Sequence, residues 1–356
     1  FKDRLCRKVV VVGGNHDSPS LLDAPGKALS HLHAHVVGTV EYEEDGAGGK
    51  TPGLEKEVVV VLGADGKPGL VVAAVPYLRD ADLRVSEVME SDADRSAKLK
   101  RGFQAHYRAV ADLARQHGAS ADGHGLPLVL TGHLYLTGAT IADKDSERSL
   151  RVGNLESLDR ELLPEADYVA MGHLHSPQAV GGCATCRYSG SPIPMAFGEA
   201  RQTKSVAIVD FVPGQPPEVR IEAIPVFQKL LQIAGSPEEI AGKLQEQVVS
   251  REAVWVDLQV TEGEGDLAPW WRQYDALVEN SGVKLLRRQN CRPGKDESPL
   301  ARAIQDQVEL EQLAPADLFA MRLGKEKDLT EDEKADFTRM FEEIARRLLE
   351  ADVYKE

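Results

Sequence analysis

Three short segments of this chain hold side chains that could bind metal or move protons. Each combines glycine with histidine, and the first also contains asparagine and aspartate. They are Gly14–Asp17, Gly132–His133 and Gly172–His175. Imidazole nitrogens and an amide oxygen suit manganese, iron, zinc or nickel better than calcium or magnesium, which prefer shells of oxygen atoms. The sequence therefore predicts a transition-metal site.

A β-strand is expected directly before each segment, because the preceding residues form short apolar runs. These runs are Val9–Val12, Leu128–Leu130 and Tyr168–Met171. Glycine then lets the backbone turn sharply and approach a bound ion closely. Open α/β folds bind ligands at the carboxyl edge of the sheet, so we predict that the segments meet at one edge of one sheet. His173 and His175 would point to the same side of an extended backbone.

The order of these motifs resembles that of the calcineurin-like metallophosphoesterases. Gly14–Asp17 indicates the superfamily, and longer blocks resemble the SbcD family of nuclease subunits in particular. The blocks are Gly132–Ala139, Asp167–Gln178 and Tyr188–Glu199. The resemblance covers nearly the whole chain. It implies an α/β fold, a metallophosphoesterase β-sandwich flanked by helices, which is incomplete at its amino terminus and carries a small α/β capping domain and a helical tail.

The resemblance also implies a role for each site residue. Two divalent ions, expected to be Mn²⁺, would clamp a phosphodiester and activate a water for in-line attack. Asn15, His133 and His173 would bind one ion, and His175 would bind the other. His16 would be the catalytic residue that stabilises or protonates the leaving oxygen without binding metal. Asp17 would not bind metal itself but would help to orient the residues that do.

The function that this resemblance implies is DNA hydrolysis in repair, recombination and replication. The chain would be the nuclease subunit of an SbcCD-type complex, a 3′–5′ exonuclease on double strands and an endonuclease on single strands. Its partners would be DNA, the SMC-like ATPase subunit SbcC and a second copy of the nuclease subunit. The sequence gives no candidate substrate-binding residue.

One part of the family pattern is missing from the sequence. An Asp-x-His motif and a Gly-Asp motif, which supply further ligands, should precede Gly14, and the thirteen residues before it contain neither. The chain also begins at Phe1 instead of methionine. We therefore expect a fragment that lacks its amino-terminal ligands. Two other functions stay open, a metallophosphoesterase that acts on small phosphodiesters and a catalytically inactive assembly module.

Length and composition fit a cytoplasmic enzyme of several domains. The 356 residues suffice for two or three domains, which we place at residues 1–225 for the nuclease, 226–292 for the cap and 293–356 for the tail. No apolar run reaches the roughly 18 residues that a membrane helix needs. The four cysteines are too few and too scattered for a disulfide framework. Cys183 and Cys186 are expected in a surface turn, with half of a metal site as the alternative.

The net charge of −15 argues against a simple nucleic-acid binder, because affinity for DNA comes largely from basic side chains on phosphates. Divalent ions, local basic clusters or a partner that makes most of the DNA contacts would resolve this conflict. Two clusters are candidates, although either could be an ordinary solvated face. They are Arg95–Arg101, and a group made of Lys284, Arg287, Arg288, Arg292 and Lys295.

Periodicity predicts the elements around these motifs. In the first domain we expect an amphipathic helix at Ser96–His117, a flexible loop at Glu41–Gly53, and two pairs of strands. The strands are Glu57–Leu62 with Gly69–Val75, and Val206–Phe211 with Val219–Ile224.

The capping domain should alternate strands with helices. The expected order is strand Lys229–Ile233, helix Pro237–Val249, strand Ala253–Thr261, helix Pro269–Glu279 and strand Val283–Arg288. The resemblance places this domain over a DNA groove, and a generic appended domain is the alternative.

A helix near the carboxyl terminus carries one apolar stripe. Its members are Phe337, Met340, Phe341, Ile344 and Leu348. Such a stripe must be buried on the chain's own domain or on a partner. The sequence alone favours neither, and the resemblance favours the coiled coil of SbcC.

Overall fold

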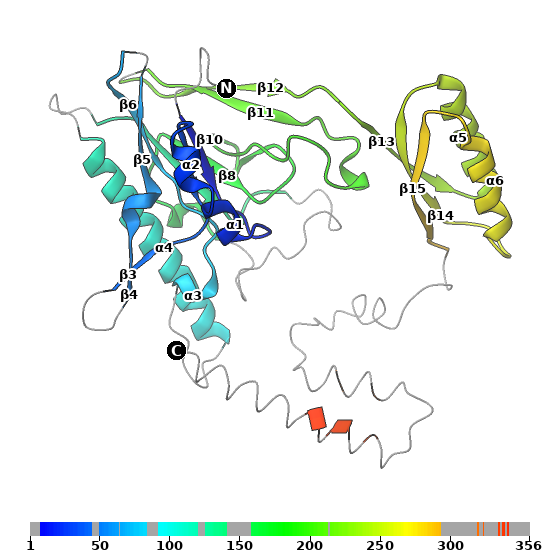
Figure 1. Cartoon of the computed structure of the whole chain (residues 1–356), viewed down its shortest axis with the longest axis horizontal. Coiled ribbons are helices and arrows are strands. Elements are labelled where there is room, and N and C mark those ends of the chain that lie inside the picture. The colour runs from blue at the N-terminus through cyan, green and yellow to red at the C-terminus, as the bar shows by residue number, and fades with distance from the viewer. Residues whose placement is uncertain are drawn as a thin grey trace. The chain divides into compact units, whose positions relative to one another are not determined.

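The chain has a mixed α/β structure, seen here in a computed structural model (Figure 1). The structure describes residues 8–44, 50–63, 65–83, 92–119, 125–140, 158–212 and 214–292, together with Phe319, Leu323, Lys334, Phe337, Thr338, Met340 and Phe341. Among these residues, no helix has the length and apolar character that a membrane crossing requires.

A six-stranded sheet forms the centre of the amino-terminal region. Its strands follow the order β5-β6-β7-β8-β10-β9. The inner strands β6, β7, β8 and β10 run parallel, whereas β5 and β9 pair antiparallel at the two edges. This confirms the predicted hairpin of β5 with β6 and both predicted strands that lead into the second and third histidine motifs. The bounds are Val58–Leu62 (β5), Pro68–Ala73 (β6), Leu128–His133 (β7), Tyr168–Gly172 (β8), Gln178–Val180 (β9) and Cys183–Tyr188 (β10).

Helix α4 (Asp92–His117) covers one face of this sheet and begins four residues before the predicted helix. Phe103 and Tyr107 of α4 are fully buried against a core that includes Val71 of β6 and Leu130 of β7. Their spacing follows the helical repeat of three to four residues, so one apolar face meets the sheet. The amphipathic helix is confirmed.

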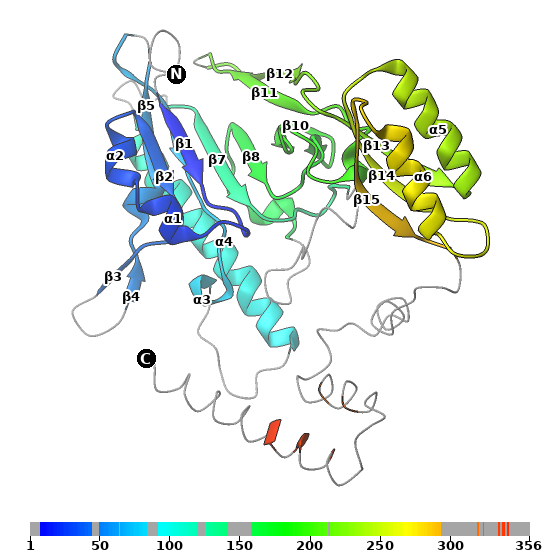
Figure 2. The ribbon, with the colours of Figure 1, turned by 45° about the vertical axis from the view of Figure 1, so that its right-hand side comes forward.

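Strands β1 (Val9–Val12) and β2 (Ala34–Val37) form a separate parallel pair, which helices α1 (Pro19–Asp23) and α2 (Gly26–Ser30) connect. Val37 of β2 packs in a core with Val72 of β6, so the pair lies on the face opposite α4 (Figure 2). The prediction that all three histidine motifs end strands of one sheet is therefore wrong. Successive residues of β6 point to opposite faces, which lets that strand contact a layer on each side.

The predicted flexible loop at Glu41–Gly53 contains a short hairpin instead. Strands β3 (Tyr42–Glu44) and β4 (Lys50–Pro52) pair antiparallel, and residues 45–49 between them lie outside the described part. Lys56 lies 2.7 Å from a carboxylate oxygen of Glu41 and 3.1 Å from one of Asp23. These ion pairs join the base of the hairpin to α1, a long-range contact that local composition did not reveal.

A short helix and a pair of strands complete the amino-terminal region. Helix α3 (Asp80–Leu83) precedes α4, and strands β11 (Ser205–Asp210) and β12 (Glu218–Ala223) form an antiparallel ribbon. The ribbon confirms the second predicted pair of strands, each shifted by one residue.

The segment after residue 228 has the predicted alternation of strands and helices. Strands β13 (Lys229–Gly235), β14 (Val254–Val260) and β15 (Val283–Asn290) form one sheet, with helices α5 (Pro237–Ser250) and α6 (Ala268–Val278) between them in the chain. Its central strand has alternate residues that are fully buried, as the sequence pattern required. These are Val254, Val256, Leu258 and Val260.

Helix α5 begins at a capping box that its sequence encodes. The Glu239 backbone N–H donates to Ser236 Oγ at 3.3 Å, and the Ser236 N–H donates to Glu239 Oε2 at 3.1 Å. These two bonds satisfy amide groups that the first turn of a helix leaves without partners.

The structure describes only part of the predicted tail stripe. The rings of Phe319 and Phe341 stack with centroids 4.3 Å apart. Phe337 and Met340 keep 41% and 52% of their surface exposed. Ile344 and Leu348 lie outside the described residues.

Gly132 should not tolerate a side chain, because strand β7 approaches α4 closely there. An added Cβ would lie 2.3 Å from Tyr107 Oη and 3.0 Å from Met171 Cε. Both neighbours are buried, so we expect Gly132→Ala to lower the free energy of unfolding by about 1–3 kcal/mol. Denaturant unfolding would measure the change.

Gly242→Ala is the matched control. Gly242 lies within α5, and an added Cβ there would meet nothing within 4 Å. We expect this variant to be more stable by about 0.5–1 kcal/mol, because alanine loses less backbone entropy than glycine in a helix. Equal effects of the two substitutions would contradict the close packing at Gly132.

Candidate metal and catalytic site

Neighbouring parallel strands bring His133 and His173 together. His133 is the last residue of β7 and pairs in register with Gly172, the last residue of β8. The imidazole centroids of His133 and His173 lie 5.2 Å apart, with an angle of 76° between the rings. The second and third motifs therefore share one site at the carboxyl end of these strands.

The first motif reaches the same site from the β1–β2 layer. The amide oxygen of Asn15 lies 2.9 Å from His133 Nε2, within hydrogen-bonding distance. Glycine is required beside this ring, because a Cβ on Gly14 would lie 2.7 Å from His133 Cε1 and one on Gly172 would lie 2.8 Å from its Nδ1. These glycines thus provide space for an imidazole as well as a turn.

His173 does not continue the strand. Its φ of 106° falls where side chains other than glycine are rare, a conformation that costs on the order of 1–3 kcal/mol. The prediction of an extended backbone at His173 is therefore wrong, because β8 ends at Gly172. Nε2 of His173 is buried and has no hydrogen-bond partner among the described residues.

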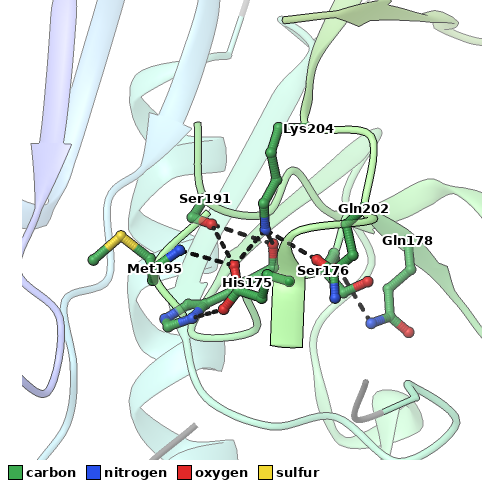
Figure 3. A network of polar contacts seen from close by, with 8 residues as sticks. His175, Ser176, Gln178, Ser191, Met195, Gln202 and Lys204 are labelled. Carbon is green, nitrogen blue, oxygen red and sulfur yellow. Dashed lines mark hydrogen bonds and ion pairs between the residues drawn. The ribbon is translucent and has the colours of Figure 1, made fainter. Parts of the chain in front are cut away.

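His175 is held by a network that the sequence did not predict (Figure 3). Its Nδ1 lies 2.9 Å from Glu199 Oε1, and Lys204 Nζ lies 2.6 Å from Glu199 Oε2. The side chains of Glu199 and Lys204 are only 1% and 4% exposed. Both residues follow β10 in a segment without regular hydrophobic spacing, so a carboxylate and an ammonium group there gave no sign of burial.

His16 and Asp17 belong to the first motif and complete the site. His16 is exposed, and its charge influences both His133 and His173. The Asp17 carboxylate accepts a hydrogen bond from the Gly14 N–H at 2.7 Å and thereby closes the loop. Asp17 thus contacts the backbone that carries Asn15.

Burial keeps two of the imidazoles neutral. Removal from water is the largest cause that lowers the pKa of His133 and His173, each to about 4. Repulsion from neighbouring imidazoles lowers the pKa of both rings further. A neutral imidazole offers a nitrogen lone pair, which is the form that binds metal.

These residues fit a metal ion in donor type. Ligand atoms about 2.1 Å from one ion and at right angles to each other lie about 3 Å apart, close to the 2.9 Å between Asn15 Oδ1 and His133 Nε2. The unpartnered Nε2 of His173 adds a third nitrogen donor. Within the described part of the chain, however, no three His, Cys, Asp or Glu side chains form a group that could hold an ion. The individual ligand roles therefore stay predictions.

The two imidazoles should make the metal-free protein less stable in acid. Their pKa of about 4 in the folded chain is below the unfolded value of 6.5. Protonation therefore favours unfolding, and stability present above pH 6.5 is lost as the pH falls towards 4, by roughly 3 kcal/mol or less per ring. Histidine proton resonances recorded with a chelator should titrate near pH 4. Midpoints near 6.5 would show that water reaches both rings.

The two cysteines do not form the predicted surface turn. Cys183 begins strand β10, and Cys186 pairs with Val169 of β8 and is buried. Burial raises the pKa of Cys186 to about 11. The local sequence resembled a turn, but pairing with the adjacent strand decided its conformation.

Only part of the two basic clusters is exposed among the described side chains. Lys100, Arg101, Lys284, Arg287 and Arg288 are exposed. Arg292, by contrast, is buried and donates hydrogen bonds to the carbonyl oxygens of Gly263 and Gly265 at 3.3 and 3.1 Å. It connects parts of the fold, so it is a poor candidate for a phosphate contact. Lys295 and the Arg95 side chain lie outside the described part.

The chain is similar to known proteins over most of its length. Residues 226–327 match the SbcD_C family, described as type 5 capsule protein repressor C-terminal domain. The SbcD subunit of the SbcCD nuclease from Escherichia coli K12 is 30% identical over 325 residues, which cover 90% of this chain and 74% of that protein. The SbcD subunit from Bacillus subtilis is 34% identical over 239 residues, 67% of this chain and 53% of the relative. The chain belongs to the SbcD family of nuclease subunits.

Proposed function

We propose that this chain cleaves DNA phosphodiesters as the nuclease subunit of an SbcCD-type complex. The observation that carries the proposal is the meeting of Asn15, His133 and His173, three donor side chains from two layers of the fold. Their surroundings are buried enough to keep both imidazoles neutral. Membership of a family whose relatives are named nuclease subunits supports a nucleic acid as the substrate.

The site divides into ligands and one proton donor. Asn15, His133 and His173 would hold one divalent ion and His175 a second, with Mn²⁺ as the proposed metal. Bound ions supply Lewis acidity and make a coordinated water a better nucleophile. His16 remains exposed beside the two partly buried rings, so it can approach a substrate and protonate the oxygen that leaves the phosphorus.

The proposal extends to partners. DNA, the ATPase subunit SbcC and a second nuclease subunit are the proposed partners, in the cytoplasm, with exonuclease action on double strands and endonuclease action on single strands. The acidic net charge of −15 fits a subunit that relies on bound cations and on a partner for much of its attraction to DNA.

Cleavage assays test the proposal against its two rivals. A version that carries the Asp-x-His and Gly-Asp motifs before Gly14 should cleave short single-stranded DNA with Mn²⁺, and a chelator should abolish cleavage. Faster hydrolysis of bis(p-nitrophenyl) phosphate than of DNA would favour a phosphoesterase for small substrates. Absence of all cleavage, with partner binding retained, would favour an assembly module. The present chain, assayed in parallel, measures what the two motifs contribute.

A further inference from the structure

We propose that Glu199 and Lys204 are positioning residues, which fix His175 with its proton on Nδ1 and its lone pair on Nε2. This inference rests on the proposed function, because it concerns how a metal ligand of that site is prepared. It assigns a role to a buried ion pair that follows strand β10 and that neither motif spacing nor charge pattern indicated.

The carboxylate sets the position of the proton on the ring. Glu199 Oε2 accepts hydrogen bonds from the Lys204 ammonium group at 2.6 Å and from the Met195 N–H at 3.1 Å, and these two donors stabilise the ionised form of the carboxylate. An ionised carboxylate only accepts hydrogen bonds. The atom that faces Glu199 Oε1 at 2.9 Å, Nδ1 of His175, must therefore carry the hydrogen. The lone pair available for a metal is then on Nε2, as carboxylate partners of metal-binding histidines commonly arrange.

The second carboxylate oxygen fixes Glu199 itself. Oε2 accepts hydrogen bonds from Lys204 Nζ at 2.6 Å and from the Met195 N–H at 3.1 Å, and Ser191 Oγ lies 3.4 Å away (Figure 3). The two carboxylate oxygens of Glu199 thus have different partners. One faces the imidazole, and the other is held by a cation and a backbone amide.

The network holds the backbone of His175 as well as its ring. The His175 carbonyl oxygen accepts hydrogen bonds from Lys204 Nζ and from the Ser191 N–H, each at 3.0 Å. Ring and backbone are therefore fixed from the same segment, residues 191–204. This arrangement compensates for the end of β8 at Gly172, after which no strand pairing of β8 constrains His175.

Glu199→Gln gives a sharp test, because glutamine has the same shape but only one accepting oxygen. The Lys204 ammonium and the Met195 N–H both donate to the Oε2 position, so the amide oxygen should take that place. The amide NH₂ then faces His175 Nδ1 and forces the proton to Nε2. A carboxylate-to-amide change beside a catalytic histidine produces a wrong tautomer in this way. Ring ¹⁵N shifts of His175, measured on this chain without metal, should reverse between nitrogens.

The matched control is Glu57→Gln, in a second buried carboxylate–histidine pair. Glu57 Oε2 lies 2.8 Å from His106 Nε2, and these side chains are 1% and 5% exposed. This substitution makes the same carboxyl-to-amide change elsewhere in the core. It should leave the His175 tautomer unchanged, so a general loss of stability cannot produce the expected result.

Binding of Mn²⁺ alone, measured by calorimetry on the version that carries the two upstream motifs, provides the second readout. Glu199→Gln should weaken binding at the His175 position by about 10- to 100-fold, and Glu57→Gln should leave binding unchanged. Lys204→Met should also weaken binding, because the buried Glu199 carboxylate loses its cation.

The inference is overturned if wild-type His175 carries its proton on Nε2, or if Glu199→Gln changes neither tautomer nor Mn²⁺ affinity. The tautomer measurement needs neither metal nor DNA. Failure of the nuclease assay with the expected tautomers would therefore reject the proposed function and leave the positioning role of Glu199 standing.

Discussion

His16→Ala should reduce turnover of DNA by about two to four orders of magnitude in a version of the protein with both upstream motifs, the usual contribution of a general acid. Binding of Mn²⁺ should survive this change. The reason lies in the surroundings of the three rings. His16 is exposed, whereas His133 and His173 are partly buried and neutral, with ring centroids 5.2 Å apart. Single-turnover cleavage and calorimetry measure the two properties separately.

Two further variants serve as comparisons for His16→Ala. His173→Ala should lose bound metal as well as activity, because it removes a buried nitrogen that has no partner among the described residues. His31→Ala removes another exposed imidazole, at the end of α2, and should leave turnover unchanged. If His16→Ala and His173→Ala lost metal equally, His16 would be a ligand and its assigned role would be wrong.

Deletion of residues 315–356 should abolish co-purification with the ATPase subunit and ATP-dependent processing of duplex ends. Cleavage of short single-stranded DNA should remain nearly intact. The described tail residues support this separation. Phe319 and Phe341 stack on each other, so the deletion removes both members of the pair. Phe337 and Met340 keep about half of their surface in water, which leaves apolar area for a partner to bury.

A double substitution tests the same surface without truncation. Phe337→Glu with Met340→Glu should weaken partner binding by about a hundredfold or more, because lost apolar burial adds to the cost of burying two carboxylates. Leu21→Glu, at a leucine of α1 that is 76% exposed, is the control and should not weaken it. If the deletion instead caused aggregation, while Phe341→Glu left partner binding intact, the helix would belong to the core of this chain.

The sequence alone determined the local elements and the chemistry of the motifs. Strands β1, β7 and β8 and helix α4 follow from apolar runs and helical spacing, and those signals survive folding because each element buries one consistent face. The order of elements from β13 to β15 was also predictable, since Val254, Val256, Leu258 and Val260 alternate along β14. The motif residues Asn15, His133 and His173 were identified by donor type before their contacts were known.

Only the tertiary structure decided which layers and partners surround these residues. Strand β1 pairs with β2 in a separate two-stranded sheet. This sheet packs as a layer on the central sheet, because β6 buries alternate residues on both of its faces. The left-handed backbone of His173 and the strand at Cys183–Cys186 likewise depend on neighbours distant in sequence. Glu199 and Lys204 show the limit most clearly. Polar residues without periodic spacing are expected in water, and only the folded chain shows that they are buried against His175, where each charge is stabilised by the other.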